Sequence, residues 1–233
     1  MTVARPPRVS LFKGLVGGRA SPAAYEWFDR AGGIGGESFS RSGFSEFFTA
    51  AARRLGKVSL DLTRQEVAQL EALDVTWPMS GWTLDELGRV TLLMLAGAQL
   101  PETAFETLVE ECYRQGDNRE RQAVLRALPF LPQADRFVPI GAEACRTHIQ
   151  PVFEALACEN PYPAAHFPEL NFNQMVLKAL FTGVALERIV GLQGRVTPEL
   201  TRMANDYASE RRAAGRSVPP DIWRVTDAKG SEP

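Results

Sequence analysis

Apolar residues recur at helical spacing in one short segment after another, and this pattern most constrains what the chain can fold into. The segment 43–55 is a clear case, with apolar side chains at positions i, i+3, i+4, i+7 and i+11 (Phe44, Phe47, Phe48, Ala51 and Leu55). No segment sustains the alternation of polar and apolar residues that a half-buried β-strand requires. The pattern therefore predicts an all-α protein.

Capping residues, prolines and glycines mark where these helices begin and end. Ser21 followed by Pro22 predicts an N-cap and first turn, and Thr63 predicts the start of another helix. Pro101 and Gly116 bound a further helix. Caps of the same kind stand later in the chain (Asp117 and Thr197).

The segment 84–97 differs from its neighbours because it is apolar nearly all round after a polar first turn. A helix of this kind has no solvent-facing side, so the pattern predicts a central and largely buried helix.

The segment 117–132 has an apolar stripe with arginines on both edges. Arg119 and Arg126 flank one edge and Arg121 flanks the other. Pro129 should end this helix, leaving the next two residues to pack from the turn. Short helices with proline-containing turns each need a neighbour to cover their apolar face. We therefore expect an irregular α-α superhelix, a HEAT-like solenoid without a fixed repeat period.

Beyond residue 139 the sequence predicts three helices in addition to the apolar helix of the stretch 158–181. The segment 140–157 reads as one long helix that Pro151 kinks. A short helix is expected over 184–191 and a long one over 200–214, after which Trp223 should dock back onto the protein.

The domain organisation follows from charge and glycine content. Residues 1–20 carry four basic residues and no acid, which predicts a flexible basic arm. Residues 21–225 are expected to form a single all-α domain, in which Gly32 to Gly36 is a flexible linker, and 226–233 a disordered tail.

Composition narrows the possible partners and the compartment. The net charge of −2 argues against a nucleic-acid partner, and no run approaches the length of apolar residues that spans a membrane. The three cysteines lack regular spacing, which is typical of reduced thiols. We expect a cytoplasmic protein without a direct membrane span.

Two histidines and two cysteines near one another raise the question of a metal site. Cys145, His148, Cys158 and His166 have the spacing C-x2-H-x9-C-x7-H. This spacing lacks the close cysteine pair of structural zinc sites, so we expect no metal and no cofactor. An aspartate-rich Mg²⁺ motif is absent from the sequence, which excludes isoprenoid-synthase chemistry.

The stretch 158–181 joins a proline-shaped connector to an apolar helix that carries polar side chains. These polar groups could line a ligand or partner site, or they could satisfy the backbone of the connector. The candidate binding residues are His148, Asn160, Tyr162, His166, Asn173, Gln174 and Lys178. No catalytic residues are assigned.

Three blocks of sequence resemble a known family. F-E-A-L-A-C-E-N-P-Y-P-A-A-H-F (153–167), N-Q-M-V-L-K-A-L-F (173–181) and D-Y-A-S-E-R-R-A-A-G-R-S-V (206–218) are similar to the EboA family. The resemblance is strong over about 117–224 and weaker before it, and Gly32 to Gly36 is a departure from the family or a local insertion.

The resemblance implies a role in moving a secondary-metabolite precursor, together with other proteins of the ebo gene cluster, including a membrane prenyltransferase-like protein. It transfers no catalytic residues. Two hypotheses follow. The first is a non-enzymatic helical adaptor that binds cluster proteins or the metabolite. The second is a small-molecule carrier or enzyme whose pocket lies near residues 148–178.

Overall fold

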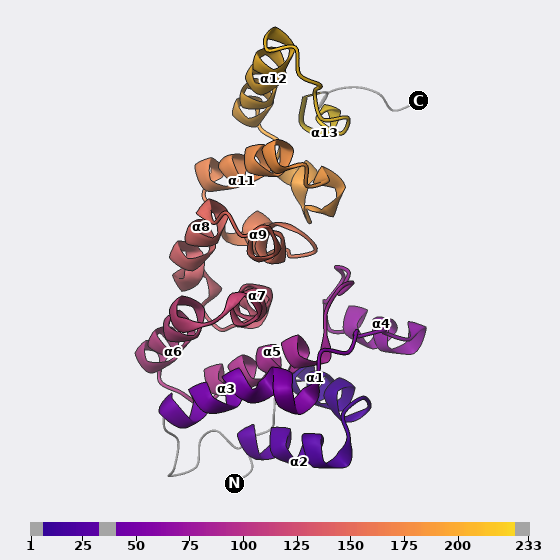
Figure 1. Cartoon of the computed structure of the whole chain (residues 1–233), viewed down its shortest axis with the longest axis vertical. Helices are drawn as coiled ribbons and strands as arrows, with labels where there is room; N and C mark the ends of the chain where they lie inside the picture. Colours follow the sequence, from indigo (N-terminus) through magenta and orange to yellow (C-terminus); the bar gives the residue numbers. More distant parts are fainter. Residues whose placement is uncertain (1–6, 33–40, 227–233) are drawn as a thin grey trace. The chain divides into compact units, whose positions relative to one another are not determined.

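The computed structural model describes residues 7–32 and 41–226, and these residues form helices and no β-strand (Figure 1). The all-α prediction is confirmed. The single piece of β-type pairing in this part of the chain is an isolated bridge between Ser59 and Thr83. The chain divides into two compact units, 1–140 and 141–233. The superhelical stacking and the single domain over 21–225 stay predictions.

In the described residues of the first unit there are seven α-helices and two 3-10 turns. They are α1 (Pro7–Gly17), α2 (Pro22–Ala31), α3 (Arg41–Leu55), α4 (Arg64–Glu71), α5 (Leu84–Gly97), α6 (Glu102–Gln115), α7 (Asn118–Ala127), η1 (Leu128–Phe130) and η2 (Ala134–Phe137). The next helix, α8 (Val138–Arg146), carries the boundary between the units.

Helix α5 is the centre of the first unit, as its composition predicted. Every residue from Leu84 to Ala96 is buried, and the helix packs against α1, α3 and α7 (Figure 1). Burying one leucine side chain stabilises a fold by about 1.5–3 kcal/mol, so this helix supplies much of the core. Gly88 permits a close approach here, because a Cβ atom at that position would lie 2.3 Å from Leu55 Cδ1.

The predicted helix starts are confirmed where capping residues marked them. Ser21 accepts a hydrogen bond from the Ala24 amide, and Thr63 and Asp117 both form capping boxes with the glutamate three residues later. Helix α7 ends at Ala127, two residues before Pro129, as expected.

The prediction of a flexible arm over 1–20 is wrong for the described part of that segment. Residues 7–17 form α1, whose buried side chains Val9, Phe12, Leu15 and Val16 pack the helix against α5. Four apolar residues at helical spacing outweigh the basic charge of the segment. Residues 1–6 lie outside the described part of the chain, as does the glycine segment 33–36.

The second unit contains α9 (Gln150–Ala157), α10 (Tyr162–His166), α11 (Glu169–Thr182), η3 (Leu186–Arg188), η4 (Leu192–Arg195), α12 (Pro198–Ala213) and α13 (Trp223–Thr226). Thr197 caps α12 as predicted, accepting a hydrogen bond from the Leu200 amide. The predicted disordered tail falls on residues 227–233 outside the described chain, apart from Thr226, which ends α13.

Three expectations in this unit are wrong. The segment 140–157 is two helices, because α8 ends at Arg146 and Ile149 is extended. Pro151 then lies in the first turn of α9, where its missing N–H costs nothing. Within residues 184–191 the chain forms only a short 3-10 turn, Leu186–Arg188, in place of an α-helix. Trp223 does not dock, since it is 54% exposed, and the neighbouring Ile222 and Val225 are buried instead.

Candidate functional site

The seven residues predicted to bind a ligand or partner do not share one environment. His148 and Gln174 are exposed, whereas Asn160, Tyr162 and Asn173 are buried. Gln174 lies on an exposed side of α11 with Leu170 and Phe181.

Asn160 shapes the connector before α10. Its Nδ2 donates to the Ala155 carbonyl oxygen at 3.0 Å, and its Oδ1 accepts from the Tyr162 amide, also at 3.0 Å. The Tyr162 ring is fully buried, and its centroid lies 4.8 Å from that of His166. The side chains of Asn160 and Tyr162 therefore hold the backbone and core of this connector together.

Lys178 binds backbone carbonyl groups at the C-terminal end of α8. Its Nζ donates to the carbonyl oxygens of Cys145, at 2.6 Å, and Thr147, and it lies 4.6 Å from the centroid of the Phe153 ring. Burial lowers the pKa of Lys178. The ammonium group stabilises the negative end of the helix dipole, so its contacts are those of a structural lysine.

Asn173 is the exception among the buried candidates. It is 1% exposed, and its Oδ1 has no hydrogen-bond partner among the described residues. The binding role of the seven residues stays a prediction, and for Asn160, Tyr162 and Lys178 the contacts favour a structural role.

The thiols show no sign of activation. Burial raises the pKa of Cys112, Cys145 and Cys158 to about 12. A nucleophilic or metal-binding cysteine needs a depressed pKa. Among the side chains that the structure describes, no group of three His, Cys, Asp or Glu residues could hold a metal ion.

A buried ionic cluster at the start of α5 was missed from the sequence. The Asp85 carboxylate accepts from Arg89 Nη1 at 2.7 Å, from Arg119 Nη2 at 2.9 Å and from the Thr83 hydroxyl at 2.7 Å. Burial acts to raise the pKa of Asp85, but the hydrogen bonds from Arg119 and Thr83 outweigh it, and the pKa is lowered. The available signal was an Asp and an Arg four residues apart in an otherwise apolar helix.

The neighbouring Glu86 makes a parallel connection. It accepts from Arg126 Nη1 at 2.6 Å and from the Thr83 amide at 2.9 Å. Arg119 and Arg126, which the sequence placed on one edge of α7, therefore both bind carboxylates of α5. The carboxylates of α5 and the arginines of α7 are ion-pair partners of one another, so this ionic cluster links α5 to α7.

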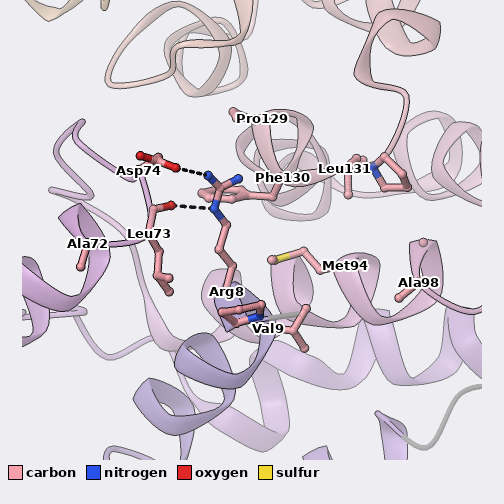
Figure 2. Close-up of a pocket in the computed structure, with 13 residues that line it drawn as sticks. Arg8, Val9, Ala72, Leu73, Asp74, Met94, Ala98, Pro129, Phe130 and Leu131 are labelled. Carbon is pink, nitrogen blue, oxygen red and sulfur yellow. Dashed lines mark hydrogen bonds and ion pairs between the residues drawn. The ribbon is translucent and has the colours of Figure 1, made fainter. Parts of the chain in front are cut away.

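The first unit also has a pocket of about 480 Å³ beside the start of α1 and the end of α5 (Figure 2). We call it the α1–α5 pocket. Its lining residues come from four separate segments: Pro7, Arg8, Val9, Ala72, Leu73, Asp74, Met94, Gly97, Ala98, Pro129, Phe130, Leu131 and Pro132. All but two of them are uncharged and apolar.

Arg8 and Asp74 are the two charged residues of the pocket. Arg8 Nε donates to the Leu73 carbonyl oxygen at 2.7 Å, and Arg8 Nη2 lies 3.6 Å from Asp74 Oδ2 (Figure 2). The guanidinium side chain is 36% exposed and the Asp74 side chain is 94% exposed. The pocket therefore combines apolar walls with one positioned cation.

Close packing and an aromatic cluster shape the wall formed by the end of α5 and residues 129–132. A Cβ atom at Gly97 would lie 2.8 Å from Pro132 Cδ, so only glycine lets the end of α5 approach this turn. The Phe130 ring lies 5.1 Å from Phe12 and 5.5 Å from Trp77, measured between centroids. The sequence indicated that residues 130 and 131 pack from a turn, but nothing local joined them to Arg8.

Residues 9–227 match the model of a protein family described as metabolite traffic protein EboA. The chain belongs to this family. The match confirms the resemblance seen in the blocks 153–167, 173–181 and 206–218, and it covers most of both units. No curated protein and no solved structure matches this EboA-family chain. Within residues 7–32 and 41–226, no helix is long and apolar enough to cross a membrane.

Proposed function

We propose that this EboA-family chain is a non-enzymatic helical binding protein that supports metabolite traffic in the cytoplasm. In this role it holds a small-molecule metabolite and contacts other proteins of the same cluster, including the membrane prenyltransferase-like protein. The family description supports the part of the proposal that concerns metabolite traffic.

The observation that carries the proposal is the lining of the α1–α5 pocket. Its volume of about 480 Å³ lies within the range of pockets that hold small molecules. The lining residues include no Ser, Thr, Cys, His, Lys or Tyr, so a nucleophile with an adjacent base is not among them. Apolar walls with a single cation suit the retention of a molecule better than its conversion.

The test is affinity capture of the tagged full-length chain from its native host, with mass spectrometry of retained small molecules and proteins. We expect the wild-type chain to retain a small molecule and at least one protein of the cluster. Ala98→Trp should abolish retention of the small molecule, because Ala98 is exposed and lines the pocket, so the larger side chain would occupy it.

Ala214→Trp is the matched control. Ala98 and Ala214 are both exposed C-cap residues with similar right-handed backbone geometry, and Ala214 does not line the pocket. Its variant should retain the small molecule. Conversion of the retained molecule by the purified chain would contradict the non-enzymatic role, and retention that Ala98→Trp does not change would contradict the pocket assignment.

A further inference from the structure

We propose that the α1–α5 pocket is selective for an aromatic small molecule that carries one carboxylate or similar anionic group, and that Arg8 binds this group. The inference rests on the proposed binding function and specifies the chemistry of its ligand. Three features of the pocket lead to it: the walls, the state of the guanidinium, and the position of Asp74.

The walls favour a flat apolar body. Met94 and Phe130 both line the pocket, and a thioether and an aromatic ring are both groups that pack well against another aromatic ring. Phe130 is held in place by Phe12 and Trp77 and yet remains partly exposed. It therefore presents a fixed aromatic surface to the pocket, and Figure 2 shows it together with Arg8 and Met94.

The Arg8 guanidinium is held in one orientation, but only one of its nitrogens donates a hydrogen bond within the described residues. The hydrogen bond from Nε to the Leu73 carbonyl oxygen fixes the orientation of the group. Among the described residues, neither terminal nitrogen of Arg8 makes a hydrogen bond, since the approach of Nη2 to Asp74 at 3.6 Å is longer than one. Two parallel N–H donors on a fixed guanidinium match the geometry of a carboxylate or a related anion.

Asp74 acts as a weak competitor for the same cation. Its side chain is 94% exposed, so water screens its attraction to Arg8. No other charged residue lines the pocket. An anion that enters the pocket can therefore displace Asp74 from Arg8 and meets no other negative charge on the pocket wall.

The experiment compares two fluorescent probes of similar aromatic size on the purified full-length chain. One is 1-anilinonaphthalene-8-sulfonate, which is anionic, and the other is N-phenyl-1-naphthylamine, which is neutral. We expect Arg8→Gln to weaken binding of the anionic probe about tenfold, the effect of losing one charge-assisted contact, and to leave the neutral probe within about twofold. Unchanged binding of the neutral probe shows that the pocket is still formed.

Two further variants sharpen the test. Asp74→Asn should tighten binding of the anionic probe by about twofold to threefold, because it removes the competing carboxylate, which is worth little at an exposed site. Arg8→Lys keeps the positive charge but lacks the planar guanidinium fork. Its affinity for the anionic probe should therefore lie between those of wild type and Arg8→Gln. Arg8→Lys also tests the role of Arg8 if the Arg8→Gln variant fails to fold.

Ala98→Trp should weaken binding of both probes, and Ala214→Trp should leave binding of both probes unchanged. If Arg8→Gln and Asp74→Asn change the affinities for both probes equally, the proposed anionic ligand class is wrong. The capture experiment tests the binding function separately. If Ala98→Trp changes neither probe, the probes do not bind in this pocket and the inference is overturned.

Discussion

Asp85 and Arg89 form an ion pair one turn apart on α5, with 2.7 Å between carboxylate and guanidinium and almost no exposure of either side chain. Arg119 of α7 binds the same carboxylate, so a single buried anion holds two cations. The central helix of the first unit is thus both its apolar core and the anchor of its main ionic joint.

Asp85→Asn should destabilise the first unit by about 3–5 kcal/mol, because it leaves the buried Arg89 without its counter-charge. Urea unfolding followed by tryptophan fluorescence measures this, since Trp27 and Trp82 are buried in the first unit. Glu199→Gln is the control, because the Glu199–Arg202 pair is exposed and its loss should leave the urea midpoint unchanged. An unchanged midpoint for Asp85→Asn would show that the pair does not support the fold.

Glu66 should make stability depend on pH. Two hydrogen bonds from Arg19, at 2.7 and 2.8 Å, are the largest cause that lowers the pKa of Glu66 from 4.5 to about 2. Because the folded pKa lies below the unfolded one, this stabilisation is present above pH 4.5 and is lost as the pH falls toward 2.

Glu66→Gln should therefore reduce the fall in the free energy of unfolding over that pH range, measured by urea titrations at successive pH values. Gln keeps an oxygen that can accept from the Thr63 amide, so the cap of α4 is preserved. Arg19→Met should reduce the fall in the same way. If both variants kept the wild-type pH dependence, Glu66 would not be the group responsible.

The three cysteines should be slow to react in the folded protein. Burial raises the pKa of Cys112, Cys145 and Cys158 to about 12, so almost no thiolate is present at neutral pH. We expect little labelling by a disulfide reagent such as 5,5′-dithiobis(2-nitrobenzoate) at neutral pH, and labelling of all three thiols in urea. One rapidly labelled thiol in the folded chain would contradict this and restore a cysteine nucleophile as a hypothesis.

Asn160→Ala should loosen the connector before α10. It removes a donor to the Ala155 carbonyl oxygen and an acceptor for the Tyr162 amide, at a cost of about 1–3 kcal/mol for the buried groups left unpaired. Hydrogen exchange measured by mass spectrometry should show faster exchange over residues 155–167. Gln174→Ala is the control, because Gln174 is exposed and its loss should not change exchange there.

Sequence alone was most informative where a structure depends on residues close together in the chain. The caps at Thr63, Asp117 and Thr197 each require contacts over three residues, and each was predicted. The burial of α5 was predicted from its apolar composition. Family membership also came from sequence, because long blocks of residues carry it.

The errors arose where distant residues decide the outcome. Residues 7–17 were assigned to a flexible arm because of their basic charge, yet Lys13 pairs with Asp29 of α2, and Arg19, just beyond α1, pairs with Glu66 of α4. Neither partner can be identified without the tertiary structure. The sequence predicts a kink at Pro151, but whether a proline bends a helix or begins one depends on where the preceding helix ends.

By itself the sequence determined the helical class, most helix starts, the buried central helix and the family, because periodicity, capping and similarity are properties of local sequence. Only the tertiary structure decided the α1–α5 pocket, since its walls come from segments around residues 8, 73, 94 and 130. The same holds for Lys178, whose partners Cys145 and Thr147 are 33 and 31 residues away. Burial and hydrogen bonding depend on which segments meet in space, and spacing along the chain does not specify that.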